Sequence, residues 1–137
     1  MEVNKKRILA ICESDPGTQR LMDIFSTKLG FQAYIKKSCV ELMSGLQGES
    51  IVPDMIFFQP SNHFDEAFEE LHRNPVYHPY RNLPIVAVTT DPREQHVHKL
   101  TDLGIAAVLL KPFGFQDLRD IIRRLHPDYQ KSNSNPV

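Results

Sequence analysis

Short, largely apolar runs alternate along the chain with longer segments in which apolar residues recur at helical spacing. Five runs have the length and composition of strands in a parallel sheet. These runs are 8–12, 31–35, 54–58, 83–89 and 105–110. Each is followed by residues whose apolar positions fall three and four apart, which predicts a helix after every strand. The pattern therefore predicts an α/β fold, a parallel sheet with helices on both of its faces.

Capping signals mark the ends of the predicted helices. Asp15 and Pro16 supply an N-cap acid and then a proline where a backbone N–H is not needed. Gly30 is placed to end this first helix, and Ser38 with Glu41 has the spacing of a capping box at the start of the second. The other predicted helices are 64–73, the segment between 91 and 104, and the segment after 114 up to 125, with a loop at 74–82.

Length and composition indicate one domain. The 137 residues, 41% of them apolar, suffice for a single core, which we place at 6–125, with 126–137 as a disordered tail or linker. A net charge of −1 gives no basic surface for nucleic acid, and no apolar run approaches the about 20 residues of a membrane span. Cys12 and Cys39 lack the spacing of a metal site or a disulfide framework, so we expect a cytoplasmic protein.

Polar residues that can carry chemistry follow the predicted strands. In open parallel sheets, ligands bind beyond the carboxyl ends of the strands, where the strand order reverses. We therefore expect any functional site to be built from the residues just past each strand, which are Glu13, Ser14, Asp15, Gln59, Thr89, Thr90 and Lys111.

Three segments carry a more specific resemblance. Residues 53–58 form a strand pattern that ends before Gln59, 83–89 form one that ends in a hydroxyl residue, and 103–113 end in lysine, proline and phenylalanine. In these segments, and over roughly 6–125, the chain resembles the receiver domain of two-component response regulators. The resemblance implies a doubly wound, flavodoxin-like sheet of five parallel strands in the order 2-1-3-4-5.

The chemistry of the receiver family requires a definite set of side chains. A carboxylate after the third strand accepts a phosphoryl group and, with adjacent acids after the first strand, holds Mg²⁺. A lysine after the fifth strand and a hydroxyl after the fourth contact the phosphoryl oxygens, and an aromatic residue on the fifth strand reports the change to a partner. By this resemblance, Lys111 matches the lysine and Thr89 matches the hydroxyl residue.

Three other parts of the pattern are altered. Gln59 stands where the acceptor aspartate is expected, and Val108 stands where the aromatic residue is expected. Glu13 and Ser14 occupy the acid pair, which leaves one carboxylate there. Because an amide is uncharged and a poor nucleophile, Gln59 cannot form a stable acyl phosphate. With Glu13 as the one assured anionic ligand, we expect neither a bound metal nor another cofactor.

A fixed cluster of hydrogen bonds is the expected replacement for this phosphate site. An unpaired lysine in a concave site is costly, so we expect Lys111 to pair with Glu13 and to donate to the Gln59 carbonyl. The longer side chain of Gln59 could also bring its amide toward Thr89.

Other acids near the site have plainer interpretations. Asp15 could act as a replacement acid, but the following Pro16 favours a helix-capping role. If the register of the third strand were different, Asp54 or Asp65 could be the acceptor. Asp54, however, lies at the start of that strand, which is the wrong end of the sheet, and Asp65 falls in the following predicted helix.

The sequence thus predicts a phosphorylation-independent pseudo-receiver, a signalling or scaffolding module without enzymatic activity. The resemblance implies partner contacts through the fourth helix, fifth strand and fifth helix, where Arg119 and Arg123 are either docking residues or part of a solvated face. A phosphoacceptor with an unusual site and a flavodoxin-like cofactor binder are the alternatives, although the acids beside Ser14 would repel a phosphate. We expect a monomer or weak homodimer that binds neither nucleic acid nor membrane.

Overall fold

The computed structural model describes residues 7–60, 80, 82–102 and 104–126. The predicted helix at 64–73, Asp65, most of the predicted loop and the tail from 127 lie outside these ranges, and the domain limits of 6–125 stay a prediction. The described elements, in chain order, are β1 (Ile8–Cys12), α1 (Pro16–Lys28), β2 (Gln32–Lys36), α2 (Cys39–Gly48), β3 (Met55–Phe58), β4 (Ile85–Thr89), α4 (Glu94–Asp102), β5 (Ala107–Leu110) and α5 (Phe115–Leu125).

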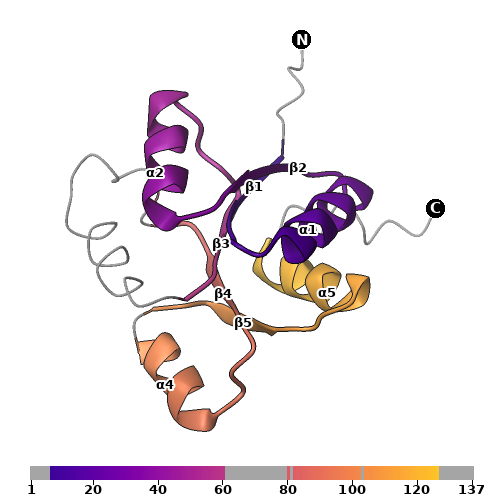
Figure 1. Ribbon diagram of the computed structural model, residues 1–137, viewed down its shortest axis with the longest axis vertical. Coiled ribbons are helices and arrows are strands. Elements are labelled where there is room, and N and C mark those ends of the chain that lie inside the picture. The colour runs from indigo at the N-terminus through magenta and orange to yellow at the C-terminus, as the bar shows by residue number, and fades with distance from the viewer. Residues whose placement is uncertain (1–6, 61–79, 81, 103, 127–137) are drawn as a thin grey trace.

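The strands form one parallel sheet in the order β2-β1-β3-β4-β5 (Figure 1). The middle of the sheet is held by pairs such as Ile11 with Ile35 and Ile11 with Phe57, which set the register of β1 against both neighbours. The predicted α/β class and strand order are confirmed. β4 and β5 each begin two residues later than predicted, because the apolar pattern runs on into the segments that lead to the strands.

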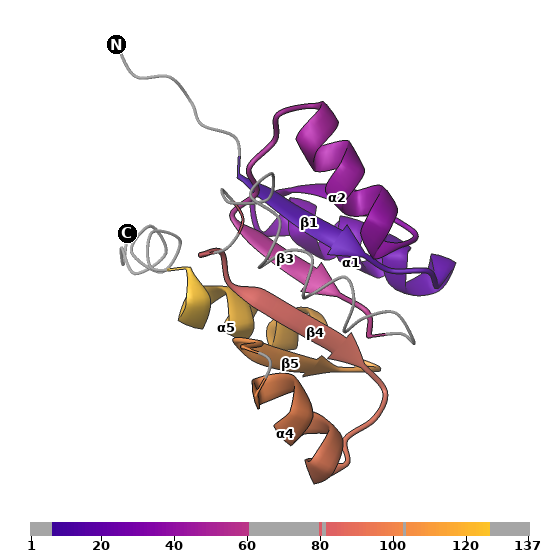
Figure 2. The same ribbon diagram turned by 90° about the vertical axis from the view of Figure 1, so that its left-hand side faces the viewer.

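Helices cover both faces of the sheet, α1 and α5 on one side and α2 and α4 on the other (Figures 1 and 2). β1, β3 and β4 lie in the middle and are apolar except for Thr89 at the end of β4, since each of their faces meets a helix layer. Two apolar clusters result, one centred on Phe57 with Leu118 of α5 and the other on Phe58 with Leu42 of α2. Among the described helices, none combines the length and the apolar content needed to cross a bilayer.

Helix caps determine where α1 begins, after the carboxyl end of β1, and where it ends, before the start of β2. Asp15 is the N-cap of α1, and its Oδ2 accepts hydrogen bonds from Thr18 N at 2.9 Å and from Thr18 Oγ1 at 2.7 Å. This confirms the predicted capping role. Gly30 ends α1 with a φ of +88°, a left-handed conformation that glycine adopts without the steric cost of a side chain.

Substitution of Phe57 tests the central core. Its side chain is 0% exposed, so Phe57→Ala should lower the free energy of unfolding by about 3–5 kcal/mol through lost apolar burial and the cavity left behind. Val40, on α2, is 74% exposed, and Val40→Ala should change stability by less than about 0.5 kcal/mol. Urea denaturation measures the free energy of unfolding of both variants. Equal losses would contradict the placement of Phe57 in the core.

Candidate functional site

The carboxyl ends of four strands meet at one edge of the sheet and carry the predicted site residues. Glu13 follows β1, Gln59 follows β3, Thr89 ends β4 and Lys111 follows β5. Backbone hydrogen bonds continue past the strands, from Gln59 N to the Cys12 carbonyl at 3.0 Å and from Lys111 N to the Thr89 carbonyl at 2.8 Å. The sheet itself therefore positions the backbone from which the site side chains project.

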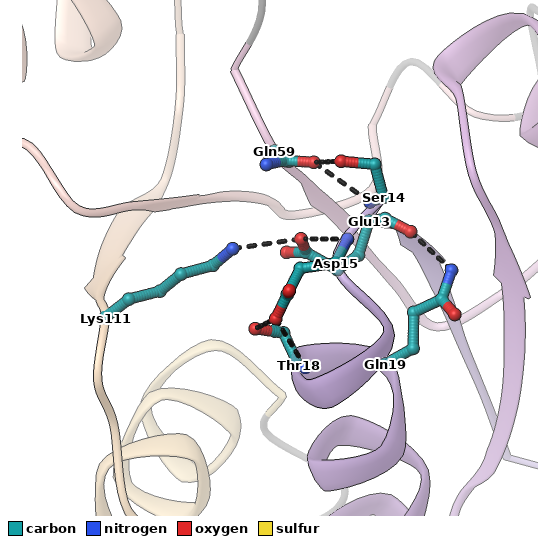
Figure 3. A network of polar contacts seen from close by, with 7 residues as sticks. All are labelled: Glu13, Ser14, Asp15, Thr18, Gln19, Gln59 and Lys111. Atoms are coloured by element: carbon teal, nitrogen blue, oxygen red, sulfur yellow. Dashed lines mark hydrogen bonds and ion pairs between the residues drawn. The ribbon is translucent and has the colours of Figure 1, made fainter.

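Glu13 and Lys111 form a buried ion pair. The distance from Lys111 Nζ to Glu13 Oε2 is 2.9 Å, and the two side chains are 14% and 2% exposed, respectively. Asp15 N donates to the same carboxylate oxygen at 3.0 Å (Figure 3). The expected pairing of Lys111 with Glu13 is confirmed. The other carboxylate oxygen, Glu13 Oε1, is buried and has no hydrogen-bond partner among the described residues.

Gln59 is held by Ser14 rather than by Lys111. Its carbonyl oxygen Oε1 accepts from Ser14 N at 3.0 Å and from Ser14 Oγ at 2.8 Å (Figure 3). The prediction that Lys111 donates to this carbonyl is wrong, because two donors from Ser14 fill the two lone pairs of the amide oxygen and the ammonium turns to Glu13. The expected approach of the Gln59 amide to Thr89 stays a prediction.

Asp15 and Gln19 complete the loop after β1. The hydrogen bonds from the Thr18 side chain and backbone hold the pKa of Asp15 below its ordinary value, because they stabilise its charged form. Gln19 Nε2 donates to the Glu13 carbonyl at 2.6 Å, which fixes the residue that carries the buried charge (Figure 3). The sequence did not single out Gln19, although its place in the first turn of α1 puts it beside the end of β1.

The donors at this edge do not fit the Mg²⁺ that the receiver family implies. Glu13 is already neutralised by Lys111, whose ammonium lies where it would repel a metal ion. The capping oxygen Asp15 Oδ2 is engaged by Thr18 and the Gln59 oxygen by Ser14, while the unpartnered oxygen Glu13 Oε1 is buried. Mg²⁺ needs several anionic or neutral oxygens in octahedral array. In the described ranges, no three metal-ligating side chains of His, Cys, Asp or Glu form a group.

Asp54 lies at the opposite edge of the sheet from Lys111. It directly precedes β3, where its Oδ2 accepts from Ile8 N at 2.8 Å and its Oδ1 lies 3.2 Å from His126 Nε2. These contacts give it a structural role at the amino ends of the strands, far from the end at which Gln59 stands. Gln59, and not Asp54, therefore stands at the carboxyl end of β3, where the resemblance expects the acceptor.

The remaining predicted residues lie on β5 and α5. Val108 is half-buried and packs against the cluster that contains Leu42 and Phe58. Arg119 and Arg123 are half-buried on α5, and Arg119 Nε lies 3.7 Å from Asp120 Oδ1. Their roles in partner contacts stay predictions.

A pair of thiols next to the site was not foreseen. The Sγ atoms of Cys12 and Cys39 lie 3.2 Å apart, although 27 positions separate the two residues in the chain. A signal was present, since Cys12 ends the first predicted strand and Cys39 follows the second, and these strands are neighbours in the implied order. Both thiols therefore belong to the same edge of the sheet.

Comparisons with known proteins identify the fold. No family model and no curated protein matches the sequence. Among solved structures, the chemotaxis protein CheY4 of Vibrio cholerae matches with a TM-score of 0.75 and 15% identity, over 88% of this chain and 99% of that chain. A sensor protein from Polaromonas sp. JS666 matches with a TM-score of 0.74 and 22% identity, over 91% and 99%.

A third solved structure is the receiver domain of the sensor histidine kinase PA1611 from Pseudomonas aeruginosa PAO1. It matches with a TM-score of 0.73 and 18% identity, over 88% of this chain and 98% of that chain. That structure has a magnesium ion coordinated in its active-site cleft. The chain therefore has the fold of response-regulator receiver domains.

Substitution of Lys111 tests the buried ion pair. Lys111→Met leaves the Glu13 carboxylate buried without its counter-charge, so we expect the free energy of unfolding to fall by about 3–5 kcal/mol. The double variant Glu13→Gln with Lys111→Met removes both charges and should be more stable than Lys111→Met alone. Chemical denaturation of Glu13→Gln, of Lys111→Met and of the double variant measures the coupling energy between the two side chains. If the stability losses of the two single variants simply added up in the double variant, the ion pair would be contradicted.

Proposed function

We propose that the chain is a cytoplasmic signalling module with the receiver fold, which acts through protein contacts and does not depend on phosphorylation. One observation carries this proposal: the side chain at the acceptor position, Gln59, is an amide whose oxygen is engaged by Ser14. An amide oxygen has no negative charge with which to attack phosphorus. The position therefore lacks the nucleophile on which phosphoryl transfer in receivers depends.

The charges around Gln59 support the same conclusion. Lys111, the residue that would contact a phosphoryl group by the family resemblance, is paired with Glu13 at 2.9 Å. To contact a phosphate, it would have to leave a carboxylate that is almost fully buried, and that charge would then lack compensation. This cost favours the resting contact over any phosphate-bound arrangement.

These contacts favour a single arrangement of the side chains at the carboxyl ends of the strands. In a switch, phosphoryl and metal binding favour a second state through contacts that the first state lacks. Here the ion pair and the Gln59–Ser14 hydrogen bonds occupy the same groups without any ligand. We therefore assign signalling to a constant surface that partners recognise.

Phosphorylation by a small donor tests this proposal. The full chain, incubated with Mg²⁺ and acetyl phosphate, should gain no phosphoryl mass. The double variant Ser14→Asp with Gln59→Asp restores two carboxylates beside Glu13 and should bind Mg²⁺ at least about tenfold more tightly, because affinity follows the number of charged ligands. Intact-mass spectrometry and titration calorimetry provide the two measurements.

The variant Gln59→Ala distinguishes this proposal from a phosphoacceptor that uses another residue. If the wild-type chain is labelled stoichiometrically and Gln59→Ala is labelled equally, the chain is a phosphoacceptor that uses another residue, and the proposal is wrong. Asp54→Asn then tests whether Asp54 takes the label. A flavin absorbance of the purified protein would instead indicate a flavodoxin-like cofactor binder.

The surface formed by α4, β5 and α5 is the proposed site of partner contact. β5 is an edge strand of the sheet, and its last residue, Leu110, is 43% exposed. α4 and α5 flank this strand on opposite faces of the sheet, as Figure 1 shows. Arg119 and Arg123 add positive charge on α5, which suits a partner with acidic residues beside an apolar contact.

Charge reversal on α5 tests this surface. A variant with Arg119→Glu and Arg123→Glu should bind a partner captured by the wild-type chain at least about tenfold more weakly, since its new negative charges would repel the acidic residues of that partner. Arg20→Glu reverses an exposed arginine on α1 and should retain the partner. Far-UV circular dichroism checks that all variants are folded. Equal capture by both folded variants would exclude the arginines from the interface.

A further inference from the structure

Cys12 and Cys39 bring two thiols into contact at the carboxyl edge of the sheet. Cys12 is the last residue of β1 and Cys39 is the first residue of α2. Their Sγ atoms are 3.2 Å apart, and the residues are 4% and 9% exposed. The structure contains both as free thiols.

We propose that Cys12 and Cys39 are a redox-active pair that a hydroperoxide oxidises to a reversible intrachain disulfide. A disulfide has an S–S length of about 2.05 Å, so the sulfurs need to approach by about 1 Å. A small displacement of the first turn of α2 toward β1 supplies this movement. Disulfides of this kind occur in the cytoplasm as transient, redox-responsive bonds rather than as structural ones.

The two thiols differ in their environment, which supports different roles for them. The hydrogen bond between the two thiols lowers the pKa of Cys12 below its ordinary value, and a hydrogen bond from the Gln59 backbone lowers it further, against the opposing effects of burial and of the Glu13 and Glu41 charges. The same hydrogen bond and burial raise the pKa of Cys39. In this proposal Cys12 reacts first as the thiolate, and Cys39 is the thiol that resolves the product.

The reaction balances with one hydroperoxide for each pair of thiols. The Cys12 thiolate attacks the terminal peroxide oxygen, the O–O bond breaks, and the leaving oxygen takes a proton to become an alcohol or, from hydrogen peroxide, water. Cys12 is then a sulfenic acid. Cys39 sulfur attacks the Cys12 sulfur, the S–O bond breaks, and the hydroxyl leaves as water with the Cys39 proton. A dithiol reductant reverses the bond by thiol exchange.

The start of α2 is the route by which a small oxidant reaches the pair. Cys39 lies in the first turn, and its neighbour Val40 is 74% exposed, so the thiol is one residue from the surface. Helix ends open more readily than helix centres, and such local opening admits a molecule of the size of hydrogen peroxide. Bulky oxidants are excluded by the burial of both sulfurs.

The disulfide would act on the same edge of the sheet as the polar cluster. The Cys12 carbonyl accepts the hydrogen bond from Gln59 N, and Glu13 follows directly in the chain. A bond from Cys12 to α2 therefore ties the first turn of this helix to the backbone that carries Glu13. The inference concerns thiols that the proposed function does not use, so either can fail without the other.

Oxidation of the reduced chain tests the pair. The protein is treated with a small molar excess of hydrogen peroxide and then unfolded in the presence of N-ethylmaleimide, which alkylates any remaining thiol. We expect both thiols to be lost together, with a mass lower by two hydrogen atoms, no added oxygen, and a peptide that links Cys12 to Cys39. Dithiothreitol should restore both thiols.

Single-cysteine variants provide the control. Cys39→Ala, and Cys39→Ser in case the first does not fold, should never show the two-hydrogen mass loss and should keep Cys12 either alkylated or with added oxygen. The inference is overturned if the wild-type chain keeps both thiols, gains oxygen on both without a link, or joins two chains instead. Circular dichroism before oxidation verifies that each variant is folded.

Discussion

The ion pair between Glu13 and Lys111 is the interaction on which the functional edge of this protein depends. The two residues are 98 positions apart and follow β1 and β5, with β3 and β4 between these strands in the sheet. Glu13 is 1% exposed, so its charge is tolerable only with a counter-charge in contact. The pair therefore specifies where both loops lie, because either loop could move only by leaving a buried carboxylate uncompensated.

The charges at this edge of the sheet differ from those that receiver chemistry requires. A phosphoacceptor site keeps excess negative charge so that a metal ion and a phosphoryl group can be bound. Here one lysine neutralises one glutamate, and Gln59 is a neutral side chain that accepts two hydrogen bonds from Ser14. The buried charges at this edge are thus paired within the protein, whereas the sheet beneath it has the strand order of a receiver.

Much of this arrangement was predictable, and the limits have physical causes. The central strands were predicted because burial on both faces leaves continuous apolar runs, and the Glu13–Lys111 pair followed from the cost of an isolated charge. The partner of Gln59 was predicted wrongly. Strand order places Lys111 and Ser14 at the same edge, but it does not encode which donor the short loop after β1 aims at the amide. The contact between Cys12 and Cys39 was within reach of topology, since neighbouring strands lead to both residues.

The polar cluster and the thiol pair are physically connected. The charge of Glu13 opposes formation of the Cys12 thiolate, because like charges at close range raise the free energy of the ionised form. Lys111 neutralises this carboxylate at 2.9 Å and thereby reduces the opposition. A site that kept several uncompensated carboxylates beside Cys12 would hold its thiol protonated and unreactive. The pairing of Glu13 with Lys111 is therefore compatible with the reactivity proposed for Cys12.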